Sequence, residues 1–295
     1  MPGPQFGHVV TGCTIGETWL GIIHRIMTSG TTQPVTEGFK RRELINLTAV
    51  VTGQPGDFYA EDYLAVDEAF VQKYISQILD NPERAEGVKY TYGNLLAGQI
   101  DQVIDKLKGD PDSYSAVMSL WDPKFHETGS SPCLNHIWVR IVQGALTLVA
   151  TFRSNEMFSA WPANAYGLRA LQAHIRDAVE PGLALGPLVT NSLSSHIDDG
   201  GWPHAQQLLK NHYGKRRTNF NDESGNFVIT RQGAEIVVER VTTGSGVVVD
   251  CFCNRSARKL MERIALDCPA LTVDHAMYLG AELTKAETME NYKQL

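Results

Sequence analysis

Residues 131–164, SPCLNHIWVRIVQGALTLVATFRSNEMFSAWPAN, decide how this sequence folds. Two strand-like runs rich in β-branched residues, His136–Val142 and Leu146–Phe152, flank a short glycine-containing turn. This pattern predicts an antiparallel hairpin. Because Cys133 precedes the first strand and Arg153 follows the second, the hairpin is expected to bring the two side chains close together. A guanidinium beside a thiol favours the nucleophilic thiolate, so this pair is the first candidate for chemistry.

Helical periodicity is found on both sides of this hairpin. Pro162 opens the run Ala163–Val179, whose apolar spacing predicts a helix, and proline is well tolerated in a first helical turn. Before the hairpin, the spacing predicts helices over Thr14–Ser29, Ala60–Leu79 and Gln99–Lys108 and a strand over Glu43–Val51. The expected fold class is α/β (α+β), a mixed sheet with packed helices.

The polar segment Lys210–Gly225 reads as a linker between two domains. Strand patterns restart beyond it at Phe227–Thr230 and Ile236–Val241, and a helical pattern follows them. We therefore expect a larger domain at residues 1–212 and a small C-terminal αβ domain at residues 220–295.

The composition is that of a globular protein. The 295 residues are 43% hydrophobic and 20% charged, which is enough to bury a large core. The 33 acidic and 26 basic residues give a net charge of −7, which argues against general nucleic-acid binding because that work needs clustered Lys and Arg. The longest apolar runs are far shorter than the roughly 20 residues of a membrane span. Met1–Gly12 lacks a signal-peptide pattern, so we expect a cytoplasmic protein with neither membrane nor nucleic-acid partner.

Five cysteines are scattered over the chain. They lack the density of a disulfide framework and the paired CxxC spacing of a zinc site, so we expect free thiols and no metal site. The simplest interpretation of four of them is an inert buried thiol: Cys13, Cys251, Cys253 and Cys268. Cys133 differs because of its predicted arginine neighbour.

Ordinary structural roles also fit the polar residues of this region. Arg153 alone is compatible with a surface ion pair, Asn164 with a helix cap, and His196 with a simple polar contact. Asp198 and Asp199 precede two glycines and fit a solvated turn better than a metal site. For Arg153, the order of the motifs along the chain favours the functional alternative.

That order resembles the thymidylate synthase and pyrimidine hydroxymethylase superfamily, in particular its archaeal-type branch. The shared order is Pro-Cys, a hairpin, Arg-Ser-x-acid and then Pro-x-Asn, and the resemblance runs from about Trp19 to Leu209. Further matches are Tyr92-Gly93, Trp121-Asp122-Pro123 and Ser195-His196-Ile197. The tail Gly225–Ala286 resembles a small domain appended to some of these proteins. The resemblance implies the mixed-sheet fold of that superfamily and a homodimer that pairs its sheets back to back.

The resemblance also implies a role for each site residue. Cys133 would be the covalent catalyst that adds to C6 of a pyrimidine nucleoside monophosphate and thereby activates C5. Arg153 would bind the phosphate with its guanidinium and Ser154 with its hydroxyl, and the Asn164 amide would bind the pyrimidine ring. His196 would contact the sugar, and Tyr92 is a further implied substrate-binding residue. Glu156 takes the place of an aspartate that holds the pterin of the cofactor, 5,10-methylenetetrahydrofolate or a related methylene-pterin.

Several positions depart from the family pattern. Leu134 replaces a histidine directly after the nucleophile, Trp138 replaces a glutamine, and Asp198 stands where a tyrosine touches the sugar. The paired arginines that a neighbouring subunit contributes would fall near residues 113–115 and are missing. The candidates to replace them are Lys40, Arg41 or Arg42, and the candidates for the catalytic base are Glu43, Glu61 or Glu68.

The same residues serve two different products, a methyl or a hydroxymethyl group at C5. Leu134 and Trp138 make the expected surroundings of the nucleophile drier, and Asn164 suits a uracil ring, so we expect methylation of dUMP. The alternatives are 5-hydroxymethylation of dUMP, dCMP or CMP, and a non-catalytic nucleotide-binding homologue suggested by the missing arginines.

Overall fold

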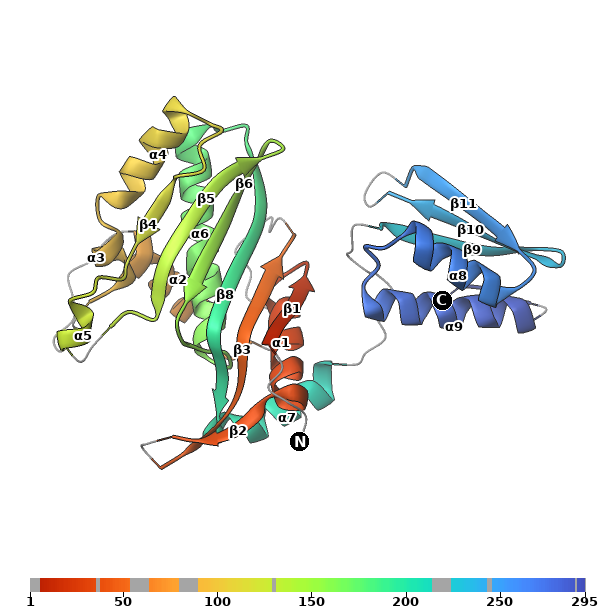
Figure 1. The fold of residues 1–295 in the computed structure, drawn as a ribbon, viewed down its shortest axis with the longest axis horizontal. Helices are drawn as coiled ribbons and strands as arrows, with labels where there is room; N and C mark the ends of the chain where they lie inside the picture. Colours follow the sequence, from red (N-terminus) through yellow and green to blue (C-terminus); the bar gives the residue numbers. More distant parts are fainter. Residues whose placement is uncertain are drawn as a thin grey trace. The chain divides into compact units, whose positions relative to one another are not determined.

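The computed structural model describes residues 6–35, 38–53, 64–79, 90–128, 131–213, 224–242, 246–289 and 291–294. The chain divides into two compact units, Met1–Gly214 and Lys215–Leu295. Within the described residues, an eight-stranded mixed sheet forms the first unit and a three-stranded sheet the second (Figure 1). The expected α/β class with a small C-terminal αβ part is confirmed.

The first unit is one mixed sheet with helices packed against it. Its elements in chain order are β1 (Phe6–Gly12), α1 (Ile15–Ser29), β2 (Thr31–Pro34), β3 (Lys40–Val51), α2 (Glu68–Leu79), α3 (Tyr92–Leu96), α4 (Gln99–Gly109), β4 (Val117–Ser119), α5 (Phe125–Thr128), β5 (Leu134–Val142), β6 (Ala145–Phe152), β7 (Asn155–Glu156), α6 (Ala160–Val179), β8 (Ala184–Asp198), a short 3-10 turn (Asp199–Gly201) and α7 (Trp202–His212). The main strand order is β1-β3-β8-β6-β5-β4, with β2 beside β3 and β7 beside β8. The pairs β1/β3, β6/β8 and β7/β8 are parallel.

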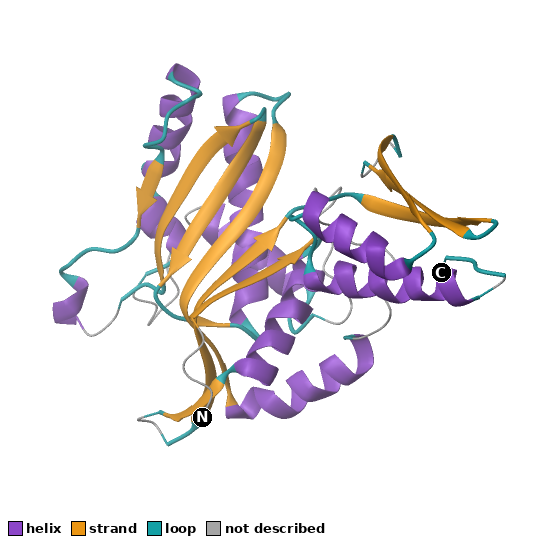
Figure 2. Ribbon diagram, turned by 45° about the vertical axis from the view of Figure 1, so that its right-hand side comes forward, coloured by secondary structure: helices purple, strands orange, loops and turns teal. Residues whose placement is uncertain are grey.

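The helices gather on one face of this sheet (Figure 2). Helix α1 packs on β1 and β3, α6 packs on β6 and β8, and α2 and α4 pack on α6. The apolar stripe predicted for α1 is fully buried, including Trp19, Ile22, Ile23 and Ile26. The helix begins after Thr14, whose side chain accepts the Glu17 N–H as an N-cap.

The predicted hairpin is confirmed as β5 and β6. Its turn consists of Gln143 and Gly144, both with positive φ, and is one residue shorter than expected. Such a turn matches the right-handed twist of paired strands. Strand β5 starts at Leu134, two residues earlier than predicted, and its register to β6 shifts between Leu134 and His136.

Other elements differ from the sequence expectations. Strand β8 lies at the centre of the sheet and was not predicted. The helix predicted to begin at residue 60 covers only Glu68–Leu79 within the described residues, and Asp67 accepts the Phe70 N–H at 2.7 Å as its cap. Helix α7 extends to His212, so the expected linker is helical where it begins.

The second unit packs two helices against its small sheet. Its elements are β9 (Asn226–Gln232), β10 (Glu235–Val241), β11 (Val248–Asn254), α8 (Ala257–Asp267) and α9 (Val273–Thr288). The sheet is antiparallel in the order β11-β10-β9. Strands β9 and β10 were predicted, whereas β11 and α8 were not. Across both units, the described helices include none with the length and apolar character that a membrane crossing requires.

Candidate active site

Cys133 and Arg153 lie side by side at the open end of the hairpin, just outside β5 and β6. The backbone N–H of Arg153 donates to the carbonyl of Cys133 at 2.9 Å. The guanidinium donates to the carbonyls of Ser131 and Pro132 and its Nη2 lies 4.0 Å from the Cys133 sulfur. Cys133 is half-buried. The predicted pairing of a thiol with a guanidinium is therefore confirmed as geometry, and the cation faces the sulfur that would carry negative charge as a nucleophile.

Three tyrosines, Tyr74, Tyr90 and Tyr92, are close enough to Cys133 for its charge to raise their pKa. Burial raises the pKa of Tyr74 and Tyr92 far above the usual value for a phenol, and charge on Cys133 raises both further. Tyr90 donates to the carbonyl of Ser131 at 2.8 Å, and burial also raises its pKa. These three phenols remain protonated at neutral pH. Tyr92, which was expected on the substrate, begins α3, where Thr91 caps the helix.

Asn164 lies inside α6 with both ends of its amide engaged. Its Oδ1 accepts a hydrogen bond from the Tyr74 hydroxyl, and its Nδ2 donates to Asn155 Oδ1 at 3.2 Å. Asn155 in turn donates to Ser192 Oγ at 3.2 Å. Asn164 is buried and lies four residues beyond the first residue of α6, so the alternative that it caps this helix is wrong.

Glu156 caps α6 in its place. Its Oε1 accepts the Phe158 N–H at 2.9 Å, and its Oε2 accepts from Ser159 N–H, Ser159 Oγ and Ala160 N–H at 2.6–3.2 Å. These bonds hold the chain that enters the helix and the N–H of its first residue, Ala160, and they add a favourable charge at the helix N-terminus. The helix therefore begins at Ala160, three residues before the predicted start.

The Glu156 carboxylate still fits the pterin that the resemblance implies. An ionised carboxylate offers about four acceptor positions. Oε2 is saturated by the cap, whereas Oε1 accepts one bond and keeps a position for an N–H of an amino-substituted ring. Glu156 is half-buried, so this position is reachable.

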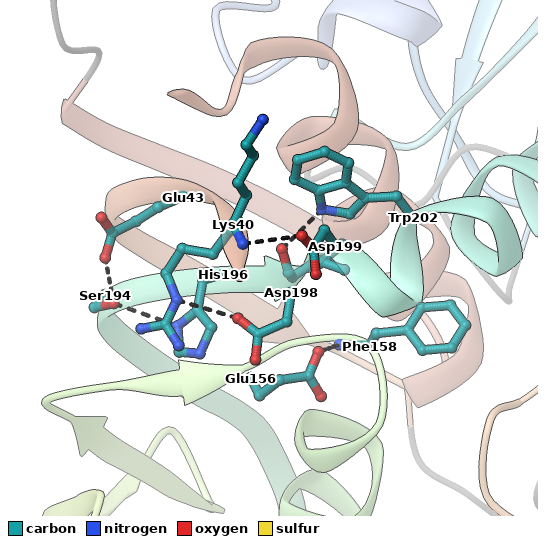
Figure 3. A network of polar contacts seen from close by, with 11 residues as sticks. Lys40, Glu43, Glu156, Phe158, Ser194, His196, Asp198, Asp199 and Trp202 are labelled. Atoms are coloured by element: carbon teal, nitrogen blue, oxygen red, sulfur yellow. Dashed lines mark hydrogen bonds and ion pairs between the residues drawn. The ribbon is translucent and has the colours of Figure 1, made fainter. Parts of the chain in front are cut away.

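His196 lies in a second polar cluster on the neighbouring strands (Figure 3). The Ser194 hydroxyl donates to the Glu43 carboxylate and lies 3.3 Å from His196 Nδ1. Because that hydroxyl has a single proton, Nδ1 must carry the hydrogen of this contact and Nε2 is left as an acceptor. Burial lowers the pKa of His196, and the charge of Arg41 lowers it further, so the neutral ring prevails.

The two clusters are joined by backbone pairing. Ser194 N–H donates to the carbonyl of Arg153 at 3.2 Å, and Glu156 pairs with His196 between β7 and β8. Ser154 is half-buried and lies between Arg153 and β7. The structure thus brings all the predicted site residues to one end of the hairpin and the adjoining part of β8.

One of the three candidate phosphate cations lies in the second cluster. Arg41 pairs with Asp198, with 3.1 Å between Nε and Oδ1. Arg42 instead donates to the carbonyl of Met27 and lies over the Trp202 ring, on the side of α1 and α7. The backbone N–H of Lys40 donates to Asp199 at 2.9 Å. Asp198 is therefore an ion-pair partner of Arg41 in this structure.

The three candidates for the catalytic base also lie in different parts of the protein. Glu43 belongs to the His196 cluster, Glu68 is exposed in the first turn of α2, and Glu61 lies outside the described residues. Among the described residues, Tyr74, Tyr90 and Tyr92 are phenols whose pKa is raised by burial and by charge on Cys133. Tyr74 could have been found from the sequence, because it shares an apolar helical stripe with Val71 and Ile78 and puts a polar tip on a buried face.

The expected drying effect of Trp138 is wrong. Its neighbours Ile137 and Val139 are fully buried on the helical side, so alternation points Trp138 to the opposite face of the sheet. Its indole N–H donates there to the carbonyl of Tyr114 at 2.8 Å. Leu134 does fit the expectation, because it is almost completely buried directly after Cys133.

Comparisons with known proteins agree with this geometry. The family model described as "Thymidylate synthase" matches residues 59–233, which is more than half of the chain, and the model "PterinBD-DUF4346" matches residues 221–294. A protein of Methanothermobacter marburgensis named "Putative thymidylate synthase" is 32% identical over 218 residues, covering 67% of this chain and 96% of its own. A protein of the same name from Methanosarcina barkeri is 29% identical over 213 residues, covering 70% and 96%. The resemblance inferred from the motifs is confirmed, and the chain belongs to the thymidylate synthase family.

Proposed function

We propose that this protein transfers a one-carbon unit from 5,10-methylenetetrahydrofolate, or a related methylene-pterin, to C5 of dUMP. The observation that carries the proposal is the 4.0 Å contact of the Cys133 sulfur with the Arg153 guanidinium, and the buried amide of Asn164, which accepts a hydrogen bond from Tyr74, supports it. A nucleophile, a cation and a ring-reading amide are the groups that covalent activation of a pyrimidine requires. Family membership supports the reaction class, and the name of the C-terminal family model supports a pterin.

The chain's own residues divide the chemistry between them. The Cys133 sulfur adds to C6 of the ring, which places negative charge on C5 and on the ring oxygen; the C5 proton is then lost to a base, and the ring double bond is restored when the sulfur leaves C6 as thiolate. Asn164 donates to that oxygen, and Arg153 faces the sulfur and, with Ser154, provides donors for the phosphate. His196 Nε2 accepts a sugar hydroxyl. When bound, the methylene-pterin supplies the one-carbon unit and, for a methyl product, the hydride that reduces it.

Methylation is favoured over hydroxymethylation by two residues. Leu134 is buried and apolar immediately beside the nucleophile, which keeps water from the reacting carbon. Asn164 carries an amide, which complements the N3–H and O4 of uracil. A hydroxymethylase acting on dUMP, dCMP or CMP is the competing outcome. Stoichiometric appearance of dihydrofolate, read by its absorbance, distinguishes reduction from hydration, and mass spectrometry of products from dUMP, dCMP, UMP and CMP identifies ring and sugar.

Substitution of the nucleophile tests the proposal directly. Cys133→Ala is expected to abolish release of tritium from C5-labelled dUMP, whereas Cys13→Ala is expected to retain it. Cys13 is a matched control because it is also half-buried but packs near Gly53. Equal tritium release by both variants contradicts covalent catalysis by Cys133. Binding of dUMP by the wild type with neither tritium release nor a covalent adduct favours a non-catalytic nucleotide-binding protein instead.

We also propose a homodimer of this chain with no nucleic-acid partner. Among the described residues of the first unit, the helices that pack on the sheet lie on one of its faces, and none of them covers the opposite face (Figure 2). That face carries partly exposed apolar side chains, including Val9 and Leu193. The net charge of −7 supports the absence of a nucleic-acid partner.

A further inference from the structure

The Asn164 amide is held at both ends by protein side chains. The Tyr74 hydroxyl donates to its oxygen, and its nitrogen donates to Asn155 Oδ1 at 3.2 Å. Asn155 is itself buried and donates to Ser192 Oγ at 3.2 Å. Tyr74 comes from α2, Asn155 from β7 and Ser192 from β8, so three separate elements fix one side chain. An amide held in this way has one lone pair and one N–H left for a ligand.

We propose that Tyr74 and Asn155 are specificity-determining residues that fix the orientation of the Asn164 amide and thereby select uracil over cytosine. The inference rests on the proposed function, in which Asn164 contacts the pyrimidine ring. Neither residue is required to touch the substrate. They act through Asn164 and are positioning residues.

The selection follows from the hydrogen-bonding edges of the two rings. Uracil presents an N3–H donor next to an O4 acceptor, whereas cytosine presents an N3 acceptor next to an N4–H donor. One orientation of a carboxamide complements uracil, and rotation by 180° complements cytosine. A freely rotating asparagine therefore serves both rings. An asparagine whose orientation is fixed serves one of them.

Rotation of Asn164 conflicts with its surroundings. It would bring the Asn164 oxygen against Asn155 Oδ1, where the present hydrogen bond is 3.2 Å long. It would also leave the Tyr74 proton without its acceptor, and that proton is retained because burial raises the pKa of Tyr74. Two acceptor oxygens in contact and a desolvated hydroxyl without a partner are both unfavourable. If Asn155 rotated as well, the Ser192 hydroxyl would have to change from acceptor to donor, so three side chains would have to reorient together.

Tyr74→Phe removes the hydroxyl and keeps the ring, so it is the first test. Dissociation constants for dUMP and for dCMP are measured by calorimetry on the full-length wild type, Tyr74→Phe and Tyr213→Phe. Tyr213 is the matched control, because it ends α7 and stacks on His24. We expect Tyr74→Phe to lower the preference for dUMP over dCMP about tenfold, the equivalent of one neutral hydrogen bond. Tyr213→Phe is expected to keep the wild-type preference.

A second variant guards against a merely structural effect. Asn155→Leu removes the acceptor for Asn164 Nδ2 and is also expected to lower the preference, chiefly by weakening dUMP. Equal weakening of both nucleotides by both variants indicates a packing role and overturns the inference, as does an unchanged preference in Tyr74→Phe. These results leave the proposed function standing if wild type binds dUMP. If wild type binds neither nucleotide, the proposed function fails and the inference fails with it.

Discussion

The Nη2 atom of Arg153 lies 4.0 Å from the sulfur of Cys133, although 20 residues separate the two in the chain. The pairing of Leu134 with Phe152 at the open end of the hairpin places the residues just outside each strand next to each other. The backbone bond from Arg153 to Cys133 then fixes the pair before any side chain is oriented. The hairpin itself therefore holds the cation beside the thiol.

Arg153→Lys tests whether the positive charge alone, or also the planar shape of the guanidinium, is needed beside Cys133. Lysine keeps the positive charge but loses the planar fork that holds the carbonyls of Ser131 and Pro132. We expect tritium release from C5-labelled dUMP to fall about tenfold to hundredfold, because hydrogen bonds to charged groups contribute about 1.5–3 kcal/mol each. Arg258→Lys, at an exposed arginine of α8, is the control. A rate for Arg153→Lys equal to that of the wild type would show that the fork is dispensable.

Glu156→Ala should affect both stability and cofactor binding. Loss of the cap is expected to lower the free energy of unfolding by about 1–2 kcal/mol, because several N–H donors lose their acceptor at a helix N-terminus. The KM for methylenetetrahydrofolate is expected to rise through loss of the free Oε1 position. Denaturant unfolding and steady-state kinetics measure the two effects.

The opposite end of α6 offers the control for this charge. Glu180→Ala makes the same substitution just beyond the C-terminus of the helix, where an acidic residue is unfavourable to the helix dipole. It is expected to leave stability unchanged or slightly increased. If both variants lose the same stability, the effect of Glu156 is not that of a cap.

The hairpin was predictable because both strands are rich in β-branched residues and the turn between them contains glycine. Strand β8 was not, because its second half, Ser192–Asp198, is rich in serine and also carries His196, all residues with weak strand preference. The polar side chains of this segment line the candidate site, and its backbone pairs with β3 and β7. Tertiary contacts, rather than local preference, therefore make this segment a strand. The sequence of β11 begins with valines, but a short apolar run of this kind is equally compatible with a buried helix, so the strand was not predicted.

Within the site, the motif order predicted which residues assemble but not how they interact. Cys133 and Arg153 meet because the hairpin is local. Tyr74 was missed because α2 is distant in sequence and only the packing of α2 on α6 brings its hydroxyl to Asn164. Trp138 lies on the face of the sheet opposite Ile137 and Val139, which the alternation of apolar residues along β5 could have indicated.

His196 should make stability depend on pH. Its folded-state pKa lies below the ordinary value of 6.5, so the unfolded chain binds the proton at a higher pH than the folded chain does. The free energy of unfolding therefore decreases as pH falls through about 6.5. His196→Gln removes this titration, and we expect its Tm to decline less than that of the wild type between about pH 7.5 and about pH 5.5.

His174→Gln provides the comparison for this experiment, because His174 is exposed on α6. Its Tm should follow the pH dependence of the wild type. An equal decline of Tm in His196→Gln and wild type would mean that other groups control the acid sensitivity.

The face of the sheet opposite the helices provides the test of the homodimer. Strand register places Val9, Thr48, Asn191 and Thr151 in one row, and these side chains point away from the helices. Leu193 lies on β8 two residues beyond Asn191 and is 47% exposed. A row of partly exposed apolar and short polar side chains is a surface that a second copy of the sheet can cover.

Leu193→Arg places a charge on this face and should convert the dimer to a monomer in sedimentation velocity at micromolar concentration. Burying an unpaired guanidinium at a two-fold interface is strongly unfavourable and occurs twice per dimer. Leu266→Arg is the control, because Leu266 is 79% exposed on α8 of the second unit. It is expected to sediment like the wild type. A wild-type chain that sediments as a monomer with full activity would contradict the dimer, and a Leu193→Arg chain that remains dimeric would move the interface to another surface.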